Sequence, residues 1–326
     1  MKFGLLLSCP TSVDTKDRFE LLQAMAIQVD HAGFDLLAAG QHFGDSDQQL
    51  LQPIPLLAAI APSVSLKLMT GVLIAPLLHP VAAAEDITSL QLICSGRAIV
   101  GVGAGHRPGD FEALGVSLEE RGRRLEDCVL RIRNLLSGKD DVKIALSSPP
   151  PIWVAASSDA GVRRAARIGD AWYVGPGTPV GTVVRQLGLY GEELSVLNRA
   201  EPAAQAIRRD VFVTGESLSN ESLADAISQR YRSQQRWGYT GDLPPDVRSQ
   251  REKIVGRETL VNSVVGEEVI AGSIEECIEQ FLHLEASVGR PVLAVLKVGW
   301  RLKTPSQVLD SIGVLTEICS HLRGEG

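Results

Sequence analysis

The chain has 326 residues, of which 44% are hydrophobic and 22% charged, a composition typical of a globular protein with a sizeable core. Its formal net charge of -7 argues against a nucleic-acid partner, because such proteins need a basic face. The five cysteines are scattered and have no C-x-x-C spacing, which indicates neither a disulfide framework nor a zinc site. The first apolar run, residues 3–7, is too short for a membrane span. We therefore expect a cytoplasmic protein without a membrane segment.

Short apolar runs alternate with segments of helical periodicity along most of the chain. The runs predict eight strands, at residues 3–7, 36–40, 66–74, 98–102, 152–156, 171–174, 211–214 and 292–298. The helix that begins near Glu119 illustrates the periodic segments, because its apolar residues recur at the spacing of one helix face. These are Leu125, Val129, Ile132 and Leu136. Ser117 and Glu120 form a capping-box pattern at its start, and residues 157–159 can cap the next helix.

Eight strands that alternate with helices predict a closed (β/α)8 barrel, whereas a doubly wound sheet commonly has five to seven strands. Residues 215–272 are less regular and show one helical segment, 223–237. No convincing linker divides the chain. We therefore expect one domain, residues 1–326, with an insertion at about 215–272 between the seventh strand and the seventh helix.

The stretch from Gly96 to Arg124 has the layout of a ligand site, because a glycine-rich strand exit leads into a polar loop and then a basic helix. The glycines at 101, 103 and 105 do not form a G-x-G-x-x-G fingerprint, since position 106 is His. They do allow backbone N–H groups to approach a flat or anionic ligand. In a barrel enzyme this loop lies on the face that carries the chemistry.

Two histidines, His42 and His106, directly follow predicted strands on that same face. An imidazole there can exchange protons near neutral pH, although a loop histidine bonded to a neighbouring carbonyl explains either residue equally well. The histidines have neither the H-E-x-x-H spacing nor a nearby acidic cluster. We therefore expect no metal site.

Two helix starts carry groups suited to an anion. Arg121, Arg123 and Arg124 lie in the first turns of the fourth helix, where the helix dipole disfavours cations unless an anion is bound. A solvated arginine face balanced by neighbouring glutamates is the alternative. Ser157 and Ser158 precede the fifth helix, either as an ordinary cap or as an anion site. Together the two starts favour a phosphorylated ligand.

Several motifs at the expected strands and loops match one known family. They are Ala32-Gly33-Phe34-Asp35, Gly40-Gln41-His42-Phe43, Thr70-Gly71-Val72-Leu73, His79-Pro80, Ser95-Gly96-Arg97, Gly101-Val102-Gly103-Ala104-Gly105, Asp110-Phe111-Glu112-Ala113-Leu114-Gly115, Pro151-Ile152-Trp153-Val154 and Ala165-Ala166-Arg167-Ile168-Gly169-Asp170-Ala171-Trp172. Over nearly its whole length the sequence resembles the bacterial luciferase-like flavin monooxygenases and deazaflavin-dependent oxidoreductases. The motifs are specific for this family and uninformative about the substrate.

The resemblance implies that reduced FMN or a deazaflavin binds at the carboxyl ends of the barrel strands. It implies further that Gly71 and Val72 form a non-prolyl cis peptide behind the flavin ring. By the same resemblance, the phosphate is bound by Arg123 and by the loop that holds Ser157 and Ser158. These expected cofactor-binding residues are Gly71, Val72, Ala104, Arg123, Ser157 and Ser158.

The sequence departs from the family pattern at two positions that concern proton transfer. Gln41 stands where luciferases carry a catalytic histidine, while His42 matches the histidine of the deazaflavin enzymes. His106 stands where sugar-phosphate dehydrogenases of the deazaflavin branch have an acid. We take His42 and His106 as the candidate catalytic residues.

The resemblance favours a two-component monooxygenase, in which a separate reductase supplies reduced FMN and O2 is used to oxygenate a small organic substrate. It also implies a homodimer. The first alternative is a deazaflavin-dependent hydride-transfer enzyme on the same barrel, and Arg107 could help to bind its longer anionic cofactor. The second is a non-catalytic flavin-binding homologue, which the Gln41 departure motivates.

Overall fold

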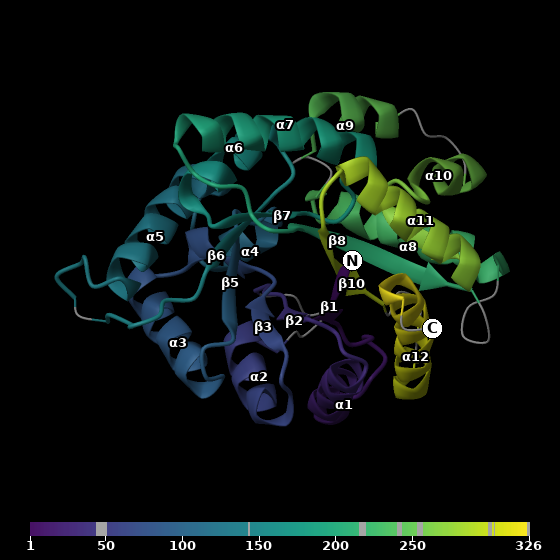
Figure 1. The fold of residues 1–326 in the computed structure, drawn as a ribbon, viewed down its shortest axis with the longest axis horizontal. Helices are drawn as coiled ribbons and strands as arrows, with labels where there is room; N and C mark the ends of the chain where they lie inside the picture. Colours follow the sequence, from purple (N-terminus) through teal and green to yellow (C-terminus); the bar gives the residue numbers. More distant parts are fainter. Residues whose placement is uncertain are drawn as a thin grey trace.

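The computed structural model describes residues 1–43, 51–142, 144–214, 220–239, 243–252, 257–298, 302 and 304–324. At its centre, eight parallel strands form a closed barrel surrounded by helices (Figure 1). Strand β10 pairs with both β1 and β8, which closes the sheet. The barrel strands are β1 (Lys2–Leu7), β2 (Leu36–Ala39), β3 (Lys67–Thr70), β5 (Ala98–Gly103), β6 (Ile152–Ala156), β7 (Ala171–Val174), β8 (Gln205–Val213) and β10 (Val292–Lys297). The predicted (β/α)8 TIM barrel is confirmed.

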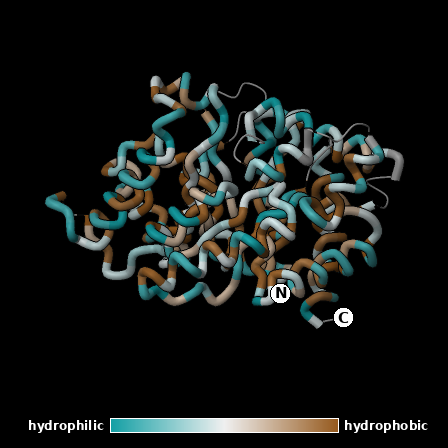
Figure 2. Tube along the Cα trace, turned by 90° about the horizontal axis from the view of Figure 1, so that it is seen from above, coloured by the Kyte–Doolittle hydropathy of each residue, from teal (hydrophilic) through white to brown (hydrophobic). Residues whose placement is uncertain are grey.

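An outer layer of helices covers the barrel. Each packs the apolar face predicted by its periodicity against the strands, so that Leu125, Val129 and Ile132 are buried. Hydrophobic and hydrophilic residues accordingly alternate along the helices (Figure 2). The helices that follow the eight strands are α1 (Arg18–His31), α2 (Pro53–Ile60), α3 (Pro80–Ile93), α5 (Arg121–Leu136), α6 (Asp159–Ile168), α7 (Val180–Val196), α11 (Ile274–Val288) and α12 (Pro305–Arg323).

Side chains that alternate along each strand create two apolar layers. The larger layer lies between the strands and the helices. The smaller one fills the barrel and consists of Leu6, Leu36, Ala38, Met69, Ile99, Tyr173, Ala206, Leu293 and Val295. On strand β8 the same alternation places Arg208 and Asp210 on the side of Ala206, toward the barrel mouth.

Strand β8 differs from its prediction, because it begins at Gln205 and not at residue 211. Three charged residues, Arg208, Arg209 and Asp210, interrupt the apolar pattern that would have extended it. Arg209 is fully buried and donates hydrogen bonds to the carbonyl oxygens of Thr178 and Glu267. The backbone pairing with β10 holds this polar half of the strand in the sheet.

The insertion between β8 and α11 contains more regular structure than the sequence indicated. Besides α8 (Asn220–Arg236), it has α9 (Pro245–Glu252), α10 (Arg257–Val264) and β9 (Val269–Gly272). Strand β9 pairs with the outer end of β8, beyond the barrel. A small apolar cluster that includes Phe212, Ile227 and Val264 joins α8, α10 and β9 to β8. Residues 215–219, 240–242 and 253–256 of the predicted insertion lie outside the described part.

The helix starts confirm one predicted cap and correct another. Ser158 is the N-cap of α6, and its Oγ accepts a hydrogen bond from the N–H of Gly161. Ser117 makes no capping bond, because a 3-10 turn, Leu118–Glu120, stands between it and α5. Within the described residues, no helix combines the length and apolar character that a membrane crossing requires.

Candidate active site

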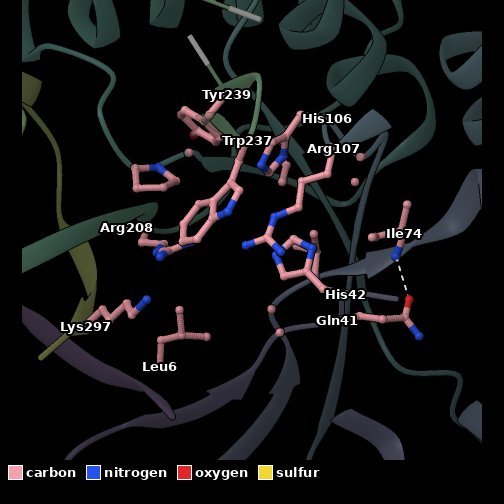
Figure 3. A pocket seen from close by; sticks show the side chains of 18 of the residues that line it. Leu6, Gln41, His42, Ile74, His106, Arg107, Arg208, Trp237, Tyr239 and Lys297 are labelled. Atoms are coloured by element: carbon pink, nitrogen blue, oxygen red, sulfur yellow. Dashed lines mark hydrogen bonds between the residues drawn. The ribbon is translucent and has the colours of Figure 1, made fainter. Parts of the chain in front are cut away.

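A cavity of about 1260 Å³ lies at the carboxyl ends of the barrel strands. It exceeds the roughly 300–1,000 Å³ of typical small-molecule sites. The ends of the strands form its floor, and the segment that follows α8 contributes Trp237 and Tyr239 to one wall (Figure 3). The cavity therefore has room for more than one ligand.

His42, directly after β2, is held by an acidic residue of the short helix α4 (Pro108–Ala113). Its Nδ1 lies 2.9 Å from Oδ2 of Asp110, a residue that is 2% exposed. The other carboxylate oxygen accepts the N–H of Phe43 at 3.1 Å. When Asp110 accepts the Nδ1 proton, the lone pair of the neutral ring is on Nε2. His42 was predicted as a candidate, whereas a loop was predicted where α4 holds its partner.

Gln41 has a supporting position beside His42. Its Oε1 accepts the N–H of Ile74 at 2.9 Å (Figure 3), and its Nε2 donates to Gln52 at 2.9 Å. Gln52 in turn donates to the carbonyl of His42 at 3.1 Å. The Gln41 amide therefore joins the loop after β2 to the backbone at Ile74. His42, by contrast, is the residue with an acidic partner.

His106 faces the insertion. Its ring is 4.9 Å from the Tyr239 ring and 6.0 Å from the His42 ring, nearly perpendicular to both. Burial, together with the charges of His42 and Arg107, lowers the pKa of His106 to about 3. Its imidazole is therefore neutral near pH 7. The neighbouring Arg107 lies over the Trp237 ring, with its Cζ 4.0 Å from the ring centroid.

A glycine-rich wall lies between His42 and β5. The Gly71–Val72 peptide bond is cis, as the resemblance implies. A Cβ added at Gly103 would come within 2.9 Å of the Val72 side chain, so glycine there leaves the space into which Val72 packs. Gly71, Val72 and Ala104 all line the cavity.

The loop between β6 and α6 forms a polar end of the cavity. Ser157 and Ser158 line it together with Gly161 and Arg164. Ser157 Oγ lies 3.3 Å from the Tyr239 hydroxyl, and a Cβ at Gly175 would come within 2.6 Å of the same Oγ. Hydroxyl groups, the N–H groups at the start of α6 and a nearby arginine are together suited to a phosphate.

Arg123 is the expected site residue that the structure does not bring to the cavity. Its side chain is 66% exposed and forms ion pairs with Glu120 and Asp127. Arg121, two positions earlier, lines the cavity with Arg164. Two residues correspond to about 200° around a helix, which places Arg121 and Arg123 on nearly opposite faces.

Charged residues missed by the sequence analysis lie on the floor near β8 and β10. Arg208, Asp210 and Lys297 line the cavity there with Tyr173. Burial raises the pKa of Asp210, but the charges of Arg230 and Arg208 outweigh it and bring the pKa to about 2. Burial and Arg208 lower the pKa of Lys297 to about 8. The signal available in the sequence was the run of three charged residues, Arg208, Arg209 and Asp210, between the apolar Ile207 and Val211.

The described residues contain no group of three or more His, Cys, Asp or Glu that could hold a metal ion. The cysteines at 9, 94, 128, 277 and 319 are free thiols. Of these, only Cys9 lines the cavity in the part of the chain that the structure describes.

A family profile described as luciferase-like monooxygenase matches residues 1–290. The chain therefore belongs to the luciferase-like monooxygenase family, whose relatives include both flavin monooxygenases and F420-dependent dehydrogenases.

Two relatives match most of the chain. The F420-dependent hydroxymycolic acid dehydrogenase of Mycobacterium tuberculosis is 27% identical over 297 residues, which cover 82% of this chain and 79% of the relative. The 4-hydroxyprotoasukamycin monooxygenase of Streptomyces nodosus subsp. asukaensis is 26% identical over 291 residues, covering 81% and 76%. An uncharacterised Mycobacterium tuberculosis protein is 33% identical over 117 residues, only 32% of this chain and 40% of that protein.

Solved structures have the same fold. Monooxygenase RslO1 from Streptomyces bottropensis superposes with a TM-score of 0.76 at 20% identity, covering 97% of this chain and 98% of its own. The oxygenating constituent of 3,6-diketocamphane monooxygenase from Pseudomonas putida, in complex with FMN, has a TM-score of 0.75 at 18% identity and covers 97% of both chains.

Proposed function

We propose that this oxidoreductase is a monooxygenase that uses reduced FMN and O2 to oxygenate a small organic substrate, with reduced FMN supplied by a separate reductase. The observation that carries the proposal is a single cavity of about 1260 Å³ that joins a backbone-lined wall to an anion-suited end. Such a volume accommodates a cofactor and a substrate together. The resemblance further supports a homodimer, and the scattered cysteines support a cytoplasmic location.

The residues present fit a planar cofactor with one phosphate. The wall formed by Gly71, Val72 and Ala104 would support the ring, and Ser157 and Ser158 would hold the phosphate at the start of α6. Arg164, whose side chain is 23% exposed, replaces Arg123 as the proposed phosphate cation, with Arg121 beside it. When bound, reduced FMN supplies the electrons for O2 activation.

The histidines divide the proton handling. Asp110 orients His42, so that Nε2 can accept a proton from a reacting group and return it. His106 is neutral near pH 7 and serves there as a hydrogen-bonding group. Trp237 and Tyr239 line the cavity beside His106, where their rings would help to exclude water and so protect reactive intermediates.

A second candidate function is F420-dependent hydride transfer. The match to the F420-dependent hydroxymycolic acid dehydrogenase over 82% of this chain favours it. The cationic lining would also suit a cofactor with a longer anionic tail. Hydride transfer requires no O2, and this difference separates the two functions.

An anaerobic titration of the purified protein tests the proposal. We expect reduced FMN to bind at least tenfold more tightly than reduced F420, and admission of O2 then to reoxidise the bound FMN at a rate different from that of free FMN. Preference for F420 without O2 consumption would contradict the monooxygenase and support hydride transfer. Binding of FMN without turnover of any aldehyde, ketone or aromatic compound would support the non-catalytic homologue.

A further inference from the structure

Two cations lie on the cavity floor, away from the anion-suited end. Arg208 belongs to β8 and Lys297 to β10, and these strands pair so that Arg208 is opposite Val295 and Lys297 opposite Asp210. The two side chains therefore extend from adjacent strands on the same inner face. Figure 3 shows them beside one another above Leu6, on the side of the cavity opposite Gln41.

The charge around this pair is predominantly positive. Among the described residues that line the cavity, seven are cationic and two, Glu119 and Asp210, are acidic. Asp210 lies 3.6 Å from Arg208, but its other carboxylate oxygen accepts a 2.5 Å hydrogen bond from the buried Arg230. The Asp210 carboxylate is thus shared between two arginines, with Lys297 also nearby, and Arg230 lies in addition 3.9 Å from the Glu268 carboxylate. Because positive charge withdrawn from water is stabilised by an anion, a further anionic group would bind favourably beside Arg208 and Lys297.

Buried polar atoms at the same place also lack partners. Within the described part of the chain, neither the hydroxyl of Tyr173, a residue 2% exposed, nor Nε of Arg208 has a hydrogen-bond partner. Oδ1 of Asp210, 3.6 Å from Arg208, has none either. Buried polar groups are nearly always satisfied in a working protein. The Tyr173 hydroxyl and Arg208 Nε are both donors, and two unpartnered donors beside a cationic pair indicate that a ligand acceptor group completes the site.

The cofactor phosphate does not explain this pair. Its proposed site is at the start of α6, after β6, whereas β8 and β10 are two and three strands further around the barrel. FMN has one phosphate, so a second anion-binding group is left for another ligand. The same cavity is also lined by apolar and aromatic side chains, among them Leu6 and Trp237 (Figure 3).

We propose that Arg208 and Lys297 bind the carboxylate of an organic-acid substrate whose apolar or aromatic body lies against Leu6 and Trp237. This inference rests on the proposed function, because it names the substrate class for the same cavity. Tyr173 supports the pair from the barrel interior. A carboxylate held there would direct the opposite end of the substrate toward the His42 wall.

Calorimetric titration of the full chain with benzoate and benzamide, each with and without bound FMN, tests the inference. The two probes share a ring and differ in charge. We expect benzoate to bind at least tenfold more tightly than benzamide. Lys297→Met and Arg208→Met should each weaken benzoate about tenfold or more and change benzamide and FMN binding by less than about twofold.

Two further variants separate binding from folding. Tyr173→Phe removes only a buried hydroxyl without a partner, so it should leave the urea midpoint unchanged or raise it while weakening benzoate. Arg123→Met, at an exposed cation outside the cavity, should change the affinity for neither benzoate nor benzamide.

The inference is overturned if the unaltered protein does not bind benzoate, or if the floor variants bind it as well as the unaltered protein. Loss of FMN binding in Lys297→Met and Arg208→Met, with benzoate unaffected, would likewise overturn it and assign the pair to the flavin ring. If the unaltered protein binds benzoate selectively but not FMN, the proposed function fails and the carboxylate site stands.

Discussion

Individual residues of the site differ in how well local sequence could identify them. His42 and Ser158 follow strands directly, so their place at the carboxyl ends could be read from the strand pattern alone. Asp110 could not be paired with His42, because 68 positions separate them and only the closed barrel brings them together. Arg121 was identifiable in principle, since it lies four residues before the buried Leu125 and thus on the same helix face. Arg123 lies on the exposed face.

The environment of His106 predicts a particular acid sensitivity. Its pKa is lowered from 6.5 to about 3 by burial and by the charges of His42, Arg107, Arg208 and Arg121. Between these values the unfolded chain binds a proton that the native chain does not, so this group reduces stability as the pH falls below 6.5. From pH 7 to pH 5 the native protein should lose about 1–2 kcal/mol more than the His106→Gln variant. Urea unfolding at both pH values measures this difference, and equal losses would contradict it.

At the scale of elements, apolar periodicity identified the barrel strands and the outer helices but not the polar half of β8. That half is placed by backbone pairing with β10 and by buried partners of its charges, none of which is a local signal. The same limit applies to α9, and to α10 and β9, whose small core with α8 and β8 is assembled from segments distant in sequence. Trp237 and Tyr239 of the insertion also line the cavity. They were not predicted as site residues, because their place depends on how the insertion folds back over the barrel.

The ion pair between α8 and β8 should be a main attachment of the insertion to the barrel. Arg230 and Asp210 are each 1% exposed, and the Asp210 carboxylate is charged near pH 7 because its pKa is about 2. Arg230→Met removes one partner and leaves that charge buried, so unfolding free energy should fall by about 3–5 kcal/mol. Urea denaturation provides the measurement.

The exposed pair of Arg185 and Asp159 is the matched control for Arg230. Its atoms are 2.8 Å apart, with side chains 44% and 45% exposed. Arg185→Met should lower the free energy of unfolding by less than about 1 kcal/mol, because water screens such pairs. A similar loss of unfolding free energy in both variants would show that burial does not make the Arg230–Asp210 pair more stabilising than an exposed pair.

For the whole molecule, the number and order of strands were sufficient to predict the barrel, because each strand alternates with a helix of the correct length. Closure then places every loop that follows a strand on one face. The cavity arises from that closure, as do its cationic lining and its two separated anion-suited regions. A chain with a net charge of -7 thus encloses a positive cavity, a contrast that total composition conceals.

The central claim is that this cavity binds a phosphorylated flavin with its phosphate at the start of α6. The most direct measurement compares FMN affinity in Arg164→Met and Arg123→Met by anaerobic titration of reduced FMN. We predict that Arg164→Met weakens FMN binding about tenfold or more, whereas Arg123→Met changes the FMN affinity by less than about twofold. Equal affinity in Arg164→Met and the unaltered protein, or a loss confined to Arg123→Met, would contradict the account.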